Sequence, residues 1–284
     1  MKQRRLGPDG PLVSEVGLGG MYLSIDGRPE EAQAIRTLHA ALDAGVTLID
    51  TADVYCLDDR DLGHNERLIA RALTGRREKV LVATKGGLRR PNGAWVHDGR
   101  PAQLLAACDA SLKALGVEAI DLYQLHAPGS YVPFTESVGA LARLREQGKI
   151  RLAGVSNVTP LELAAARRIV PIATVQNRWN VFDRGPERDG MLAACEAAGI
   201  AFLAYSPFGG GNRAPKLTRN ERLAAEAKKR GITPHRLLLA WMLAKSPVAL
   251  PIPGSRQAHN AEDSAWASGV ELSPADVMEI EATL

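Results

Sequence analysis

Four side chains in the first half of the chain have the chemistry needed to reduce a carbonyl group. Three apolar segments and the turn after the first of them end in Asp50, Tyr55, Lys85 and His126. Reduction of a carbonyl requires a proton for the oxygen as hydride reaches the carbon, and a phenol can supply that proton. We expect the ammonium of Lys85, held by Asp50, to lower the pKa of Tyr55 toward the neutral range. His126 could donate a hydrogen bond to the carbonyl oxygen.

Each of these residues has a simpler interpretation when it is taken alone. A single aspartate often caps a loop, a single tyrosine often lies at a rim with its hydroxyl in water, and lysines are usually solvated. A lysine that ends a buried segment is costly unless a carboxylate lies beside it, and Asp50 is the natural partner of Lys85. The catalytic interpretation therefore requires that these segments are neighbouring strands ending at one face.

The rest of the chain predicts elements that would bring the four residues together. Short β-branched segments alternate with longer segments of helical periodicity, which is typical of β/α units and a parallel sheet. We predict eight strands, at residues 16–19, 46–51, 80–85, 120–125, 150–155, 172–176, 200–205 and 249–252. Helices are predicted at 29–44, 65–73, 101–115, 135–147, 160–169, 188–198 and 233–244, with a final capping helix at 273–283.

Eight β/α units predict an α/β fold of the TIM-barrel type, a (β/α)₈ barrel. Such barrels often form one domain of roughly 250 residues, and we expect residues 1–284 to form a single domain. Glycines at 45, 116, 148 and 199 are expected to end helices, and Thr-Pro pairs at 159 and 233 to begin them. The longest segments after strands, at 52–64, 86–99, 127–133 and 206–218, should surround the C-terminal mouth, where barrel enzymes place their active sites.

Composition favours a cytoplasmic enzyme over several other classes of protein. No apolar stretch is long enough for a membrane span, and the first residues lack the pattern of a secretory signal. Because 35 basic residues are balanced by 32 acidic ones without a dense basic block, neither nucleic acid nor a membrane is expected as a partner. Cys56, Cys108 and Cys195 are scattered without metal-ligand spacing, so we expect no metal site and a reducing compartment.

Motifs along the whole chain resemble those of the aldo-keto reductase superfamily. In the family's order they are VGLGGM, DTADVY with GHNERLIARAL, ATKGG, DLYQLH, GVSN, VQNRWN, AYSPFGG and LPIPGS. The resemblance places Asp50, Tyr55, Lys85 and His126 on the family's catalytic tetrad and implies NADPH as the cofactor. Several motifs are similar to those of the microbial branch that includes pyridoxal reductases, while other similar members act on sugars or simple aldehydes.

The resemblance also implies a set of cofactor contacts. Tyr205 would stack on the nicotinamide ring, and Ser156, Asn157 and Gln176 would hold its carboxamide, which suits neutral hydroxyl and amide groups. Ser255 and Arg256 precede a predicted helix and would cradle the adenosine 2′-phosphate. The other expected contacts are Gly20, Met21, Asp50, Ser206, Phe208, Gly209, Ile252, Gly254, Glu262 and Asp263. Many members carry lysine in place of Gly254 and asparagine in place of Asp263, so a strict preference for NADPH over NADH is not predicted.

The expected partner is a small-molecule carbonyl compound, pyridoxal and aldose sugars included, and the expected assembly is a monomer or a small homo-oligomer. Tyr22, Trp95 and His126 are predicted to contact the substrate, and further aromatic candidates are Tyr131, Trp179 and Phe208.

Two other functions stay open. A catalytically quiet, NADP(H)-binding regulatory subunit is disfavoured by the four matched residues. A barrel hydrolase is disfavoured because Asp50 is matched to a lysine instead of a second carboxylate, and because the six histidines lack metal-ligand spacing.

Overall fold

A closed parallel barrel forms the centre of the computed structural model, which describes residues 1–129, 131–211 and 213–283. Within these residues eight parallel strands form one sheet. In spatial order they are β3 (Leu18–Gly19), β4 (Leu48–Asp50), β5 (Leu81–Gly86), β8 (Ile120–Leu125), β9 (Ile150–Ser156), β10 (Ile172–Arg178), β11 (Ala201–Tyr205) and β12 (Ala249–Pro251). Gly17 N donates to Pro251 O at 3.0 Å and Gly19 N to Pro253 O at 2.9 Å, which joins the first strand to the last. The predicted (β/α)₈ fold is confirmed.

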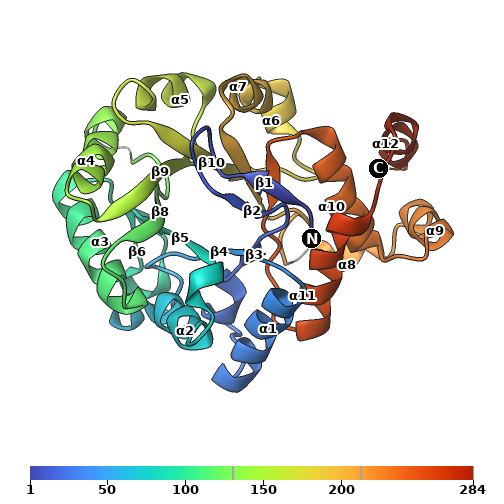
Figure 1. The fold of residues 1–284 in the computed structure, drawn as a ribbon, viewed down its shortest axis with the longest axis horizontal. Helices are drawn as coiled ribbons and strands as arrows, with labels where there is room; N and C mark the ends of the chain where they lie inside the picture. Colours follow the sequence, from blue (N-terminus) through green and yellow to red (C-terminus); the bar gives the residue numbers. More distant parts are fainter. Residues whose placement is uncertain (130, 212, 284) are drawn as a thin grey trace.

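Helices surround the barrel on its outside (Figure 1). Those that follow successive strands are α1 (Glu31–Asp43), α2 (His64–Ala72), α3 (Pro101–Leu115), α4 (Phe134–Glu146), α5 (Pro160–Ala166), α7 (Met191–Ala198), α10 (Pro234–Lys245) and α11 (Ala258–Ala265). Their ends follow the predicted signals: Gly116 and Gly199 are left-handed caps, and Thr159 and Thr233 cap helices that begin with proline. Short αβ connections therefore hold each strand against its neighbours.

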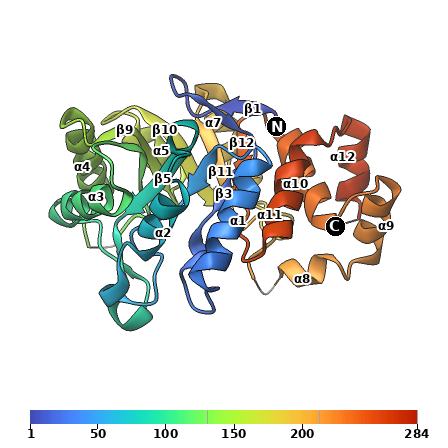
Figure 2. The same cartoon turned by 60° about the horizontal axis from the view of Figure 1, so that its bottom comes forward.

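Four further helices lie beyond this ring, namely α6 (Gly185–Arg188), α8 (Ala214–Leu217), α9 (Glu221–Lys229) and α12 (Pro274–Glu281). The sequence analysis predicted α12 but not α8 or α9. Both α9 and α12 pack against α10, at the side of the barrel (Figures 1 and 2). In the described residues, no helix combines the length and the apolar character that a membrane crossing requires.

An N-terminal hairpin that was not predicted closes the N-terminal end of the barrel. Its strands are β1 (Gln3–Arg5) and β2 (Leu12–Ser14), and it lies over the barrel centre in Figure 1. Leu6 and Val13 of this hairpin region join an apolar cluster inside the barrel, formed with Leu48, Ala83, Leu122, Ala201, Leu203, Leu250 and Ile252. Because alternate residues of a strand point inward, the next inward residues of the same strands lie closer to the C-terminal mouth.

Candidate active site

Lys85 is the centre of a buried hydrogen-bond network at the C-terminal mouth. Its side chain is fully buried, and its Nζ donates to Asp50 Oδ2 at 2.7 Å, to the carbonyl oxygen of Thr51 at 2.8 Å and to the hydroxyl oxygen of Tyr55 at 3.1 Å. These three bonds use all three ammonium hydrogens. The other carboxylate oxygen of Asp50 accepts from Gln176 Nε2 at 2.7 Å. A buried charge is stable only when it is paired and hydrogen-bonded, and both charges here meet that condition.

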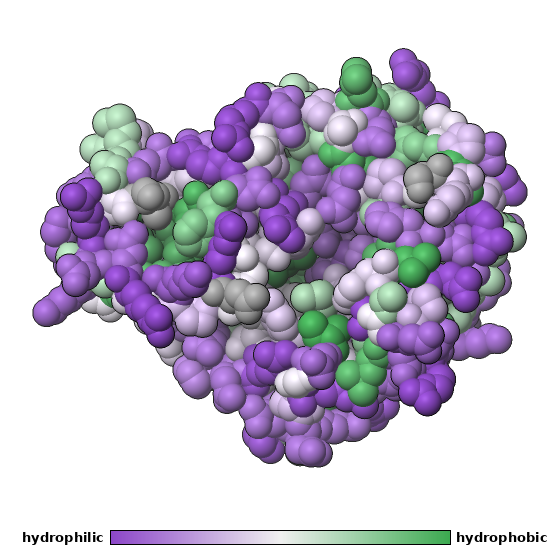
Figure 3. Space-filling view, turned by 180° about the vertical axis from the view of Figure 1, so that it is seen from behind, coloured by the Kyte–Doolittle hydropathy of each residue, from purple (hydrophilic) through white to green (hydrophobic). Residues whose placement is uncertain are grey.

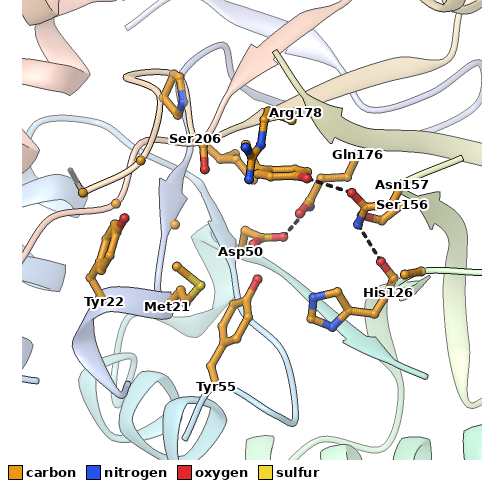
Figure 4. Close-up of a pocket in the computed structure, with 18 of the residues that line it drawn as sticks. Met21, Tyr22, Asp50, Tyr55, His126, Ser156, Asn157, Gln176, Arg178 and Ser206 are labelled. Carbon is orange, nitrogen blue, oxygen red and sulfur yellow. Dashed lines mark hydrogen bonds between the residues drawn. The ribbon is translucent and has the colours of Figure 1, made fainter. Parts of the chain in front are cut away.

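Tyr55 and His126 lie next to this ion pair. Tyr55 follows β4 in a tight turn, in which its N–H donates to the carbonyl of Ala52, and the side chain is buried. His126 directly follows β8 and is held by a backbone hydrogen bond to Gly86. The two rings meet edge to face at 5.8 Å. The four residues predicted from the sequence therefore come together at the ends of three neighbouring strands, as Figure 4 shows for Asp50, Tyr55 and His126.

The protonation states in this network differ in one respect from the expectation. Burial raises the pKa of Tyr55 above its ordinary value of 10.0, and the opposing charge of Lys85 does not overcome it. The expected lowering is therefore wrong for the site without ligands. The pKa of Lys85 lies above its ordinary value because Asp50 and Tyr55 outweigh the effect of burial. Burial and the charge of Lys85 hold the pKa of His126 well below 6.5, so its imidazole is neutral.

A second set of strand ends continues the polar layer around the mouth. Ser156 ends β9, Gln176 lies near the end of β10 and Tyr205 ends β11. The Tyr205 hydroxyl donates to Asn157 Oδ1 at 2.8 Å, and Asn157 Nδ2 donates to the carbonyl of His126 at 2.9 Å. Asn157 and Ser206 both have positive φ, 59° and 51°. Left-handed backbone at non-glycine residues is often found at functional sites, and here it occurs directly after two strands.

These residues line a cavity of about 680 Å³, and Figure 3 shows the hollow on the face opposite the N-terminal hairpin. The predicted site residues in its wall are Met21, Tyr22, Asp50, Tyr55, Trp95, His126, Ser156, Asn157, Gln176, Tyr205, Ser206, Phe208, Ile252 and Gly254. Lys85 lies beneath the wall. Trp179 is not part of the cavity: it is fully buried against Phe202 and Trp241, because the residue after the inward Arg178 faces the helices.

Ser255 and Arg256 lie beyond the cavity, ahead of α11. Arg256 donates to the carbonyl of Asp26 at 2.9 Å, lies 5.1 Å from the ring of Tyr22, and its buried Nε has no partner among the described residues. Gly254 allows Tyr22 to approach, because a Cβ at position 254 would lie 2.9 Å from Tyr22 Cδ2. This close approach explains why lysine, present in many similar chains, is replaced by glycine here.

The remaining predicted cofactor contacts lie outside the cavity wall: Gly20, Gly209, Ser255, Arg256, Glu262 and Asp263. Asp263, on α11, is paired with Arg236 of α10 at 2.5 Å. Its role toward a cofactor stays a prediction.

The cavity also includes residues that the sequence analysis did not select. They are Gly19, Leu88, His97, Ala127, Arg178, Pro207, Gly210, Gly211 and Ala214. Leu88 and His97 belong to a short hairpin of β6 (Leu88–Arg89) and β7 (Val96–His97), which two-residue strands cannot signal in a sequence. Arg178 had a usable signal, since it lies two residues beyond Gln176 on the same strand and therefore on the same face.

Comparison with known proteins agrees with the fold and the site. The model of the Aldo/keto reductase family matches residues 15–284. A glycerol dehydrogenase from Gluconobacter oxydans is 31% identical, with 99% of this chain and 94% of that chain covered and a TM-score of 0.85. A thermostable aldo-keto reductase, solved with the inhibitor epalrestat, is 30% identical, with full coverage of both chains and a TM-score of 0.85.

An aldo/keto reductase from Klebsiella pneumoniae, solved with NADP and acetate, is 28% identical, with 99% of this chain and 95% of that chain covered and a TM-score of 0.84. The family model covers almost the whole chain, and the barrel and the ends of its strands agree with it. The chain therefore belongs to the aldo/keto reductase family.

Proposed function

We propose that this protein reduces aldehydes or ketones to alcohols, with NADPH as the reductant and Tyr55 as the proton donor. One observation carries the proposal: the Tyr55 hydroxyl lies at a cavity of about 680 Å³ and is hydrogen-bonded, at 3.1 Å, to a buried lysine. A proton donor for a carbonyl oxygen needs both access to the substrate and a group that stabilises its conjugate base. The arrangement around Tyr55 supports both.

Each of the four residues has a distinct task in this reaction. Tyr55 transfers its proton to the carbonyl oxygen, and the ammonium of Lys85 then stabilises the phenolate that remains. Asp50 keeps Lys85 charged and in place through the 2.7 Å ion pair. His126, which is neutral, can donate one ring N–H to the carbonyl oxygen and so stabilise the negative charge that develops there.

The cofactor site is proposed from the chemistry of the residues around the mouth. NADPH, when bound, supplies the hydride that adds to the carbonyl carbon. Tyr205 offers a flat aromatic face in the cavity wall, and Ser156, Asn157 and Gln176 offer hydroxyl and amide groups to a carboxamide. Arg256 has an unpartnered buried Nε among the described residues and precedes the N-terminus of α11, so this segment suits a phosphate group. The NADP complex of the Klebsiella pneumoniae relative supports the same assignment.

A steady-state assay of NADPH oxidation tests the proposal directly. The panel contains glyceraldehyde, pyridoxal, xylose and benzaldehyde, and glyceraldehyde is included because a glycerol dehydrogenase is among the similar structures. We expect saturable turnover of at least one of these compounds. Tight binding of NADPH, seen as quenching of its fluorescence, with no turnover of any aldehyde would contradict the proposal and favour a regulatory NADP(H)-binding subunit.

A further inference from the structure

Arg178 occupies a position from which it can contact a substrate directly. On β10, Thr174, Gln176 and Arg178 follow one another on the inward face, because alternate residues of a strand point to the same side. Thr174 is bonded to Gln124 at 3.1 Å and Gln176 to Asp50 at 2.7 Å. Arg178, the last of the three, is exposed and lines the cavity above them. It is therefore the next layer of the barrel above the proposed catalytic residues.

The guanidinium of Arg178 is not used by the fold. In the described ranges it has no carboxylate within 4.0 Å and donates no hydrogen bond, and it lies 5.7 Å from the centre of the Tyr205 ring. Arg184, six residues further along the chain, differs in this respect, because it pairs with Glu187 at 2.5 Å and with Glu281 at 2.8 Å. Arg184 has a structural task that its contacts explain, whereas the contacts of Arg178 leave five N–H donors free.

The charges around the cavity favour a negative group near Arg178. Asp50 is the carboxylate that the described cavity wall contains, and both of its oxygens are occupied, by Lys85 and by Gln176. The charges of Asp50 and Lys85 cancel, which leaves the positive charge of Arg178 uncompensated at the wall. In a cavity that is partly shielded from water such a charge attracts anions more strongly than it would on an open surface.

We propose that Arg178 determines substrate specificity by binding an anionic group, a carboxylate or a phosphate, of the carbonyl substrate. This inference rests on the proposed reductase function and names the substrate class of the same site. Guanidinium binds both groups through two parallel hydrogen bonds, which an ammonium cannot reproduce. Figure 4 shows Tyr55 and Arg178 reaching into the cavity from opposite sides. A substrate with its carbonyl at Tyr55 can therefore extend its other end toward Arg178.

A matched pair of aldehydes tests the proposal. The probes are 4-carboxybenzaldehyde and its methyl ester, which have similar shapes and similar ring electronics but differ by one charge. We expect kcat/KM of the wild-type protein to favour the carboxylate by about tenfold or more, the effect of one charge-assisted hydrogen bond. In Arg178→Gln this ratio should fall to near one, and in Arg178→Lys it should be intermediate. The same assay with 4-formylphenyl phosphate shows which of the two anions is preferred.

Arg145→Gln is the matched control, because it removes the same charge from the exposed surface of α4, outside the cavity. The control should keep the full wild-type ratio. Absence of turnover with either aldehyde would count against the reductase function itself. Equal kcat/KM for both aldehydes in the wild type, or a ratio that Arg178→Gln does not change, would overturn the role of Arg178 alone. A loss of NADPH affinity in Arg178→Gln with an unchanged ratio would overturn it as well, and would assign the residue to the cofactor.

Discussion

The two ends of the barrel are built from the same strands but hold opposite kinds of side chain. At the N-terminal end, Leu48, Leu122 and Leu203 meet the hairpin residues Leu6 and Val13 in an apolar layer. At the C-terminal end the next inward positions carry charged and polar groups, joined by hydrogen bonds of 2.7 to 3.1 Å around Lys85. One end is sealed and the other opens into a cavity.

This difference separates stability from chemistry along the barrel axis. The apolar layer removes hydrocarbon from water, which stabilises the fold whatever the reaction is. The polar layer holds a buried ion pair, which is at best a weak source of stability, since desolvation offsets the attraction between the charges. We therefore expect substitutions at the sealed end to change the free energy of unfolding, and substitutions at the open end to change turnover.

The largest effect on turnover among the residues around Tyr55 is expected for Lys85→Met. The variant removes the ammonium that stabilises the phenolate, so kcat/KM should fall by about 10³-fold, within the range for a disrupted acid catalyst. Steady-state NADPH oxidation measures this loss, and thermal unfolding reports any destabilisation from the unpaired Asp50. A variant that stays folded and keeps more than a tenth of wild-type turnover would show that Lys85 has no such role.

At the sealed end, Leu203→Ala should lower the free energy of unfolding by about 2–5 kcal/mol, the usual cost of a cavity at a buried leucine. Leu203 is fully buried in the apolar layer. Urea unfolding measures the change, and Leu161→Ala, at an exposed position of α5, is the control. The kcat of the folded variant should stay close to that of the wild type. If kcat dropped as far as in Lys85→Met, the division between the two ends would be wrong.

A smaller effect is expected for Gln176→Leu. Gln176 reaches the reaction through Asp50, to which it donates at 2.7 Å, so it acts as a positioning residue. Its loss should reduce kcat by about tenfold, the value of one hydrogen bond to a charged group. Gln176→Glu is the complementary variant, because a carboxylate would repel Asp50 and should reduce kcat further. A Leu variant with lower activity than the Glu variant would argue against this role.

No effect is expected from pH across the neutral range. Tyr55 must be protonated to act as the acid, and because its pKa lies above 10.0, that form is lost only as the pH rises past this value. His126 has a pKa well below 6.5, so its imidazole stays neutral as the pH falls toward 6.5. A plot of kcat/KM against pH should therefore be flat from about pH 6.5 to about pH 9. A decline with an apparent pKa between about 7 and 8 would mean that Lys85 outweighs burial when ligands are bound.

The sequence predicted the regular parts of this molecule well and its irregular parts poorly. The eight strands and the helices between them repeat one pattern, and Gly116, Gly199, Thr159 and Thr233 mark their ends by local chemistry. The hairpin of β1 and β2 was missed because its strands have three residues each and include charged side chains. Helix α9 was missed because its charged sequence, ERLAAEAKK, lies outside the repeating pattern and folds by packing against α10.

The candidate site shows the same division. Strand ends fix Asp50, Lys85 and His126, so their meeting could be predicted from the order of the strands. The protonation of Tyr55 could not, because it depends on how far burial opposes the charge of Lys85. The rim residues Leu88 and His97 depend on a loop hairpin that has no sequence signal.

The central claim, that Tyr55 supplies the proton, is tested most directly by Tyr55→Phe with two measurements on the same sample. This variant keeps the ring and removes only the hydroxyl. We predict a fall in turnover of about 10²–10⁴-fold, the usual contribution of a positioned acid, with unchanged quenching of NADPH fluorescence on binding. Turnover close to that of the wild-type protein, with NADPH still bound, would contradict the account.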